Sequence, residues 1–277
     1  MASAPQLHIT LLPGSRGLLE MHARELPQRD DLCGAFCGAL ALGAAGLSEH
    51  EGQPLDQDAV AIAAGSVVSA TPDPSILPHG ETGRRDYRLE IPTIADSEYS
   101  GTTAAGVLAA VQVLSGGALD AIPFNGPWSA AALGALFEAA ASLERPVSLI
   151  ANFATHHLWG SRASVGELLG YLLDGNQDGP PPDWRVGHFA CVVGRVRGPG
   201  GDLYAVADTY PALGNRGVHM QPSERLAAAL ERRDMPAGGM LAIVSREDAA
   251  AIRAGTSAAG LREEMWDNGT VTQGASR

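Results

Sequence analysis

One segment of this chain, CGAFCGALALGAAGL at residues 33–47, consists only of small and apolar residues. A helix of this composition has no polar stripe to turn toward solvent, so it suits close packing against other elements. Gly46 is expected to end the helix, because glycine is the preferred residue just past a helix C-terminus. The segment therefore predicts a closely packed helix that begins at Cys33.

The rest of the chain contains helical patterns first and β-like patterns later. Further helices are expected at residues 18–26, 56–64, 102–114, 129–143, 165–173, 222–233 and from 247 onward, with Asp56 and Ser129 as N-caps. Strands are expected at residues 147–153, 187–196, 203–207 and 240–244. The Pro-rich, polar stretch at 69–100 predicts a loop-rich segment.

The order of these elements predicts the fold class. Helices that precede strands, rather than alternate with them, favour an α+β fold over parallel βαβ units. The turn-rich residues 197–202 join two β-like runs, which predicts an antiparallel hairpin. We expect a single domain over residues 1–277, with a helical part at about 15–145, a sheet part at about 146–246, and a C-terminal helix and tail at 247–277.

Net charge, apolar runs and cysteine content predict which partners and which cellular location to expect. A formal net charge of −12 without a cluster of Lys or Arg argues against nucleic acid as a partner. The apolar runs fall short of the ~20 residues that a membrane helix needs, and the start of the chain lacks a signal-peptide pattern. Three Cys in 277 residues do not indicate a disulfide framework, so we expect reduced thiols and a cytoplasmic location.

Composition also bears on the source of the protein, and the absence of nucleotide-binding motifs bears on its cofactors. Abundant Ala and Gly, with scarce Lys, are typical of a GC-rich bacterial source. No GxGxxG follows a predicted strand and no GxxxxGKS/T occurs, so the chain lacks the parts that bind dinucleotides or nucleotide phosphates. We expect no cofactor.

Cys33 is the candidate nucleophile. A thiol at a helix N-terminus faces unpaired backbone N–H groups and the positive end of the helix dipole, which stabilise the thiolate. Asp30 and Asp31 oppose this effect by like charge unless they point to solvent or cap the helix. The alternative is a buried core cysteine, which is the interpretation that we keep for Cys37 and Cys191.

Three further residues complete a candidate site around Cys33. His188 begins one strand of the hairpin and Asp208 ends the other, so pairing of the strands would bring the carboxylate beside the imidazole. There it would fix the tautomer of His188 and stabilise its cation. Gln28, five residues before Cys33, could donate an amide N–H to an oxyanion. The structural alternatives are a strand-start histidine, a turn-forming aspartate and a loop glutamine.

Three short segments resemble papain-like cysteine peptidases, most closely the double-glycine leader peptidases and related bacterial domains. They are QRDDLCGA at 28–35, GHFACVVG at 187–194 and VADTYP at 206–211. The order Cys, His, Asp agrees with that superfamily, whereas the Gln lies one residue closer to the Cys than in its usual pattern.

The resemblance implies a papain-like fold, in which a helical part carries the Cys and packs on an antiparallel sheet that carries the His and the Asp. It also implies that Cys33 is the nucleophile, His188 the base, Asp208 the orienting residue and Gln28 the oxyanion donor.

The predicted function is a thiol-dependent hydrolase that cleaves an amide or peptide bond through an acyl-thioester on Cys33. An acyl- or aminoacyl-transferase of a small-molecule pathway would use the same residues, with an amine in place of water. A non-catalytic, peptide-binding papain-like domain is the third possibility. The expected partner is a peptide or a small acyl or amide substrate.

His156 and His157 follow a predicted strand and offer a further site. His156 is the second choice for the base, because it also ends a strand. Both could meet His188 and Cys191 in a zinc site, but adjacent residues at a strand end point to opposite sides. Because no CxxC or HExxH accompanies them, no metal is expected.

Overall fold

The computed structural model describes residues 6–271. Its helices are α1 (Ser15–Glu25), α2 (Cys33–Ala44), α3 (Gln57–Ala64), α4 (Ala104–Leu114), α5 (Ala130–Ala141), α6 (Val165–Asp174), α7 (Ser223–Glu231) and α8 (Ala249–Thr256). The main sheet contains β1 (His8–Leu11), β6 (Leu119–Asn125), β7 (Ser148–Ala154), β8 (Gly187–Arg197), β9 (Asp202–Ala207), β10 (Val218–Pro222), β11 (Gly239–Ser245) and β12 (Arg262–Glu263). Two small ladders pair β2 (Glu49–His50) with β3 (Gln53–Pro54), and β4 (Val68–Ser69) with β5 (Thr93–Ile94).

The main sheet is antiparallel. Its strands follow the order β10-β9-β8-β7-β11-β6-β12, and β1 pairs with β8. Every pairing between the described strands of this sheet runs antiparallel. The α+β class is therefore confirmed. The expected hairpin of β8 and β9 is formed, with Cys191 opposite Ala207.

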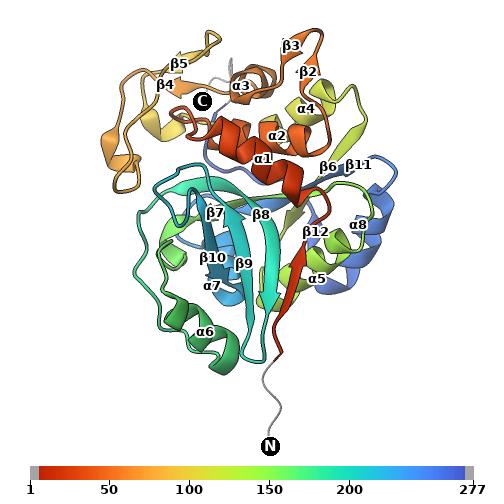
Figure 1. Cartoon of the computed structure of the whole chain (residues 1–277). Helices are drawn as coiled ribbons and strands as arrows, with labels where there is room; N and C mark the ends of the chain where they lie inside the picture. The colour runs from red at the N-terminus through yellow and green to blue at the C-terminus, as the bar shows by residue number, and fades with distance from the viewer. Residues whose placement is uncertain (1–5, 272–277) are drawn as a thin grey trace, which may run out of the picture.

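Helices cover both faces of the sheet, and each face builds its own core. Alternate residues of β8 divide between the two cores, because successive side chains of a strand point to opposite faces. Cys191 and Val193 pack on the side of α1 to α4, whereas Ala190 and Val192 pack on the side of α5, α7 and α8. Figure 1 shows α1 to α4 grouped at the top of the view and the other three helices in its lower half.

The segment that begins at Cys33 forms the central helix α2, as predicted. Its residues from Gly34 to Leu42 are all buried, because α1, α3, α4 and β8 surround it. These neighbours leave no position for a charged side chain, which explains its composition. The helix ends at Ala44, and Gly46 follows with a left-handed φ of 83°.

The predicted caps and the loop-rich segment are confirmed. Asp56 accepts the backbone N–H of Ala59 at 2.9 Å, and Ser129 accepts that of Ala132 at 3.1 Å. Residues 69–100 contain only the last residue of β4, the two-residue strand β5 and short 3-10 turns. Within the described residues, no helix is both long and apolar enough to cross a membrane.

The expected division into a helical part at 15–145 and a sheet part at 146–246 differs from this fold. β1, β6 and β12 lie outside 146–246 but belong to the main sheet. α5 lies within 15–145 but packs with α7 and α8, on the opposite face from α2. Pro123 weakens the β signal of residues 119–125, so the sequence did not predict β6. A proline is tolerated there because β6 lies near the edge of the sheet, with only the two-residue β12 beyond it. Residues 272–277 of the expected tail lie outside the described residues.

Gly106 lies where α4 crosses the end of α3, and a Cβ added there would collide with the carbonyl oxygen of Ala64. Because this oxygen belongs to the backbone and cannot move aside, we expect Gly106→Ala to lower the free energy of unfolding by about 1–3 kcal/mol. The control is Gly170→Ala in α6, where a new Cβ would lie 3.9 Å from Cβ of Asn176, an ordinary van der Waals distance. It should raise stability by about 0.5–1 kcal/mol, since alanine is the better helix former. Urea unfolding measures both, and a neutral Gly106→Ala would contradict the close crossing.

Candidate active site

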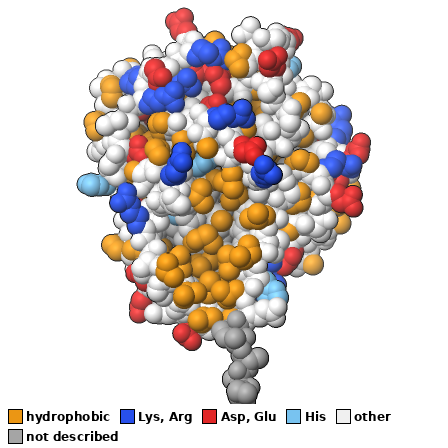
Figure 2. All heavy atoms as spheres, viewed as in Figure 1, with side chains coloured by type: hydrophobic (Ala, Val, Ile, Leu, Met, Phe, Trp, Pro, Cys, Tyr) orange, Lys and Arg blue, Asp and Glu red, His pale blue; other side chains and the backbone are white. Residues whose placement is uncertain are grey.

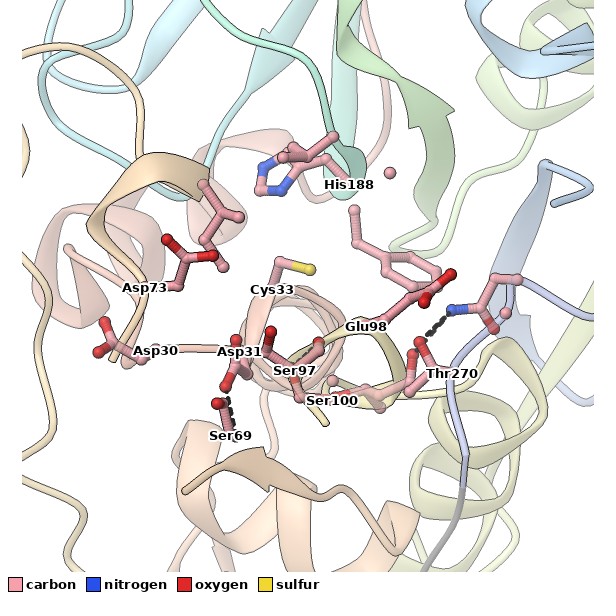
Figure 3. Close-up of a pocket in the computed structure, with 18 of the residues that line it drawn as sticks. Asp30, Asp31, Cys33, Ser69, Asp73, Ser97, Glu98, Ser100, His188 and Thr270 are labelled. Atoms are coloured by element: carbon pink, nitrogen blue, oxygen red, sulfur yellow. Dashed lines mark hydrogen bonds between the residues drawn. The ribbon is translucent and has the colours of Figure 1, made fainter. Parts of the chain in front are cut away.

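A cavity of about 500 Å³ opens between the start of α2, the start of β8 and the segment 69–101. Cys33, His188 and Gln28 all line it. Figure 3 shows the Cys33 side chain extending from the end of its helix into this space, with the His188 ring across from it. Asp208 is buried next to His188. The structure thus brings together all four of the residues singled out in the sequence.

Cys33 is the first residue of α2 and is partly exposed. No side chain of the described residues caps this end of the helix. The unpaired N–H groups of the first turn and the positive end of the helix dipole therefore lie at this cysteine. Cys37 and Cys191 are fully buried, and burial raises the pKa of the Cys37 thiol.

His188 and Asp208 meet across the hairpin. Nε2 of His188 lies 2.9 Å from Oδ1 of Asp208, and both side chains are buried. The backbone N–H of Thr209 donates to the same oxygen at 2.7 Å. Because an ionised carboxylate only accepts hydrogen bonds, Nε2 of His188 carries a proton, and Nδ1 is the ring nitrogen left for Cys33.

This contact favours the charged form of the imidazole. Burial by itself lowers the pKa of His188, but the Asp208 carboxylate and the Cys33 side chain outweigh it and raise that pKa to about 10. Burial also opposes the charge of Asp208, yet His188 and His219 hold the pKa of its carboxyl well below the usual range. The site is therefore built to hold an imidazolium between a carboxylate and a sulfur.

The second oxygen of Asp208 is occupied by a histidine that the sequence analysis missed. Nε2 of His219 lies 3.1 Å from Oδ2 of Asp208. Gln221 fixes the tautomer: its Oε1 accepts the N–H of Trp159, so its amide nitrogen must donate, and it lies 3.0 Å from Nδ1 of His219. Nδ1 of His219 therefore accepts, and Nε2 carries the hydrogen that it donates to Oδ2 of Asp208.

A predicted strand at residues 218–222 would have placed His219 and Gln221 on one face of the sheet, because positions two apart in a strand share a face. The short, polar sequence VHMQP carries too weak a β signal for that assignment.

Two contacts fasten the segment before Cys33 to the end of the hairpin. Nε2 of His22, on α1, lies 2.6 Å from the carbonyl oxygen of Asp208. The backbone N–H of Gln28 donates to the carbonyl oxygen of Thr209 at 2.9 Å. Both bonds hold the nucleophile segment in place independently of any contact between Cys33 and His188.

The side chain of Gln28 lies in the wall of the cavity. Its Oε1 is buried and has no hydrogen-bond partner among the described residues. An oxyanion needs a donor, so the role that the resemblance implies would fall to Nε2 of this amide and not to the unpartnered Oε1.

Asp30 and Asp31 neither cap α2 nor point freely into solvent. Asp30 accepts the backbone N–H of Arg84 at 2.8 Å, and Asp31 accepts that of Ser69 at 2.7 Å, a bond drawn in Figure 3. Burial raises the pKa of Asp31. These two carboxylates tie the segment 69–101 to the residues just before Cys33, so that segment forms a wall of the cavity.

Aromatic rings enclose the imidazole of His188. Trp184 meets it edge-on with 4.9 Å between ring centroids, Phe153 does so at 6.0 Å, and Tyr210 stacks at 6.3 Å. Apolar rings keep water away from the contact of His188 with Asp208, and lower local polarity strengthens it.

His156, the second choice for the base, does not line this cavity. It lies with His157 in a 3-10 turn after β7, where both imidazoles point to one carboxylate. Their Nε2 atoms lie 2.8 and 3.1 Å from the two oxygens of Asp234. The expectation that these neighbours point to opposite sides is wrong, because the strand has already ended at Ala154. Arg185 pairs with the same carboxylate at 2.9 Å.

The pKa shift of His188 predicts how stability depends on pH. A histidine whose folded pKa is raised adds stability that is fully present below its unfolded pKa of 6.5 and is lost as pH rises through about 10. Asp208→Asn removes the main charge that raises the pKa of His188. We therefore expect this variant to be less stable than the natural protein at neutral pH, with a difference that shrinks as the pH rises above 6.5 and is lost by about pH 10. Urea unfolding at a series of pH values measures it; a difference independent of pH would contradict the ion pair.

Comparison with known proteins places this site within a family. No curated protein matches the chain. A family described as "Family of unknown function (DUF6885)" matches residues 12–267, which include Cys33, His188, Asp208 and Gln28. The match covers nearly the whole chain, and the protein therefore belongs to the DUF6885 family.

Proposed function

We propose that this protein is a thiol-dependent hydrolase that cleaves an amide bond through an acyl-thioester on Cys33. One observation carries the proposal: the sulfur lies in an open cavity, the imidazole faces it, and the buried Asp208 carboxylate lies 2.9 Å behind the imidazole. Nucleophile, base and orienting group are the parts that covalent acyl transfer requires.

The arrangement of elements supports a papain-like interpretation of the fold. Cys33 begins a buried helix, and that helix packs on the antiparallel sheet whose hairpin carries His188 and Asp208. Gln28 precedes the cysteine and lines the same cavity. The positions of Cys33, His188 and Asp208 are those that the resemblance of the three sequence segments implies, whereas Gln28 lies one residue closer to the cysteine than in that pattern.

The first half of the proposed reaction forms the acyl-thioester. The Cys33 thiolate attacks the carbonyl carbon, and the electron pair of the C=O bond moves to oxygen. The Gln28 amide and the backbone N–H of Cys33 are the donors available to this oxyanion. As the carbonyl re-forms, the C–N bond breaks, and His188 gives its Nδ1 proton to the departing amine.

The second half releases the acyl group. His188, now neutral, takes a proton from water as the water attacks the thioester carbonyl, and the C–S bond breaks to regenerate the thiolate. Asp208 stays ionised and stabilises the imidazolium in each half. Because Cys33 is partly exposed, water can reach the thioester, which favours hydrolysis over transfer to an amine.

Alkylation tests the nucleophile without knowledge of the substrate. With iodoacetamide at graded pH, followed by peptide mass mapping, we expect Cys33 to react first, since Cys37 and Cys191 are fully buried. Its rate should reach half of the plateau below the pH of about 8.5 that holds for a free thiol. Asp208→Asn should slow the reaction at neutral pH. A Cys33 that reacts like a free thiol, or not at all, would favour the non-catalytic, peptide-binding alternative.

The same protein can be tested for the acyl intermediate with 4-nitrophenyl acetate. The hydrolase predicts a burst of nitrophenol and an acetyl group on Cys33 by intact mass, both absent in Cys33→Ser. Decay of the acetyl enzyme in water supports hydrolysis; decay only after addition of an amine favours the transferase.

Gln28→Ala tests the oxyanion donor. Loss of one donor from an oxyanion site lowers the rate of acylation by about 10²–10³-fold. We expect that loss in the burst rate, whereas alkylation by iodoacetamide, which forms no oxyanion, should change little. Equal loss in both reactions would indicate that Gln28 acts only by holding the Cys33 segment.

A further inference from the structure

Arg232 is a buried cation that forms no ion pair with an Asp or Glu in the described part of the chain. It follows the last residue of α7 and is only 2% exposed. None of the ion pairs between described residues includes its guanidinium, although eight other arginines of the chain pair with Asp or Glu at 3.0 Å or less. Burying a charge costs several kcal/mol, so a buried cation without a partner is rare unless its charge is used.

Neutral oxygen atoms hold this guanidinium in place. Nη2 donates to Oδ1 of Asn152 at 2.6 Å and to the carbonyl oxygen of Ala237, and Nη1 donates to the carbonyl oxygen of Phe153 at 3.4 Å. Nε has no partner among the described residues. These bonds fix the orientation of the group but do not neutralise its charge.

The guanidinium lies directly behind the candidate site. Arg232 lines the same cavity as Cys33 and His188. A Cβ added to Gly187, the residue before His188, would lie 3.1 Å from Nη1 of Arg232. Nδ2 of Asn152, the amide that holds Arg232, also donates to the carbonyl oxygen of His188 at 3.3 Å. Arg232 therefore leaves little room for a side chain at residue 187, immediately before His188.

Electrostatics link Arg232 to the cysteine. Burial lowers the pKa of Arg232 to about 10, and the charge of Cys33 is the one that acts in the opposite direction. The attraction between two charges is mutual, so the cation also favours the ionised sulfur.

We propose that Arg232 is a positioning residue that holds Cys33 as a thiolate, supplying a second positive charge to the sulfur beside that of His188. The proposal rests on the proposed function and adds to it a charge that neither the sequence nor the resemblance indicates. The other charged or titratable residues that line the same cavity are His188, Asp30, Asp31, Asp73, Arg85, Glu98, Tyr99, Arg185 and Tyr210.

The pH profile of iodoacetamide alkylation at Cys33 tests this role. Arg232→Gln removes the charge and keeps polar contacts, so its half-maximal rate should move to higher pH. A move of one pH unit lowers the rate about tenfold on the acidic side. Arg232→Lys keeps the charge and should retain most of the natural profile. Arg233→Gln is the matched control, because Arg233 is the neighbouring arginine, its side chain is 88% exposed and it does not line this cavity.

Each outcome decides the proposal. An unchanged pH profile in Arg232→Gln overturns the proposal. A shift in Arg232→Lys as large as that in Arg232→Gln also overturns it, because the hydrogen bonds of the guanidinium, and not its charge, would then be what matters. If Arg232→Gln does not fold, as circular dichroism will show, Asn152→Asp takes its place. That change sets a carboxylate where Oδ1 now lies 2.6 Å from Nη2, and it should move the profile in the same direction. An unreactive Cys33 in the natural protein would overturn the proposed function itself.

Discussion

The buried carboxylate of Asp208 is the interaction on which the arrangement of the site depends. Its oxygens face N–H groups of His188, Thr209 and His219, and its backbone oxygen faces His22. These partners come from β8, the turn after β9, β10 and α1. Removing an ion from water costs several kcal/mol unless its hydrogen bonds are satisfied, so the fold must keep all these elements together around this one residue.

The placement of Cys33 follows from that constraint. α1 is joined to the hairpin through His22, and the segment after α1 is joined to it through Gln28. The helix that begins at Cys33 then packs against β8, and Gly34 permits this: a Cβ there would lie 3.3 Å from Phe189 and 3.0 Å from Thr102. Sulfur and imidazole are thus set opposite one another by packing and by backbone bonds, before any attraction between them is considered.

Charge around the cavity is organised in two ways. The carboxylates nearest the cysteine in sequence, Asp30 and Asp31, accept backbone N–H groups of the segment 69–101 and so build the wall of the cavity. The cations, His188 and Arg232, are both buried and line the same cavity as the sulfur. Their burial matters, because a charge screened by water would act on the thiol far more weakly.

The local properties of this protein were determined by its sequence. The small apolar residues after Cys33 predict a closely packed helix, and the turn-rich residues 197–202 between two β-like runs predict the hairpin that brings Asp208 to His188. These inferences succeed because helix packing surfaces and hairpins depend on residues close together in the chain. Only the tertiary structure decided that α5 lies on the opposite face of the sheet from α2, that His219 holds the second oxygen of Asp208, and that Arg232 lines the same cavity as Cys33. Those contacts join residues far apart in sequence, and they form only when packing of the whole chain brings their elements together.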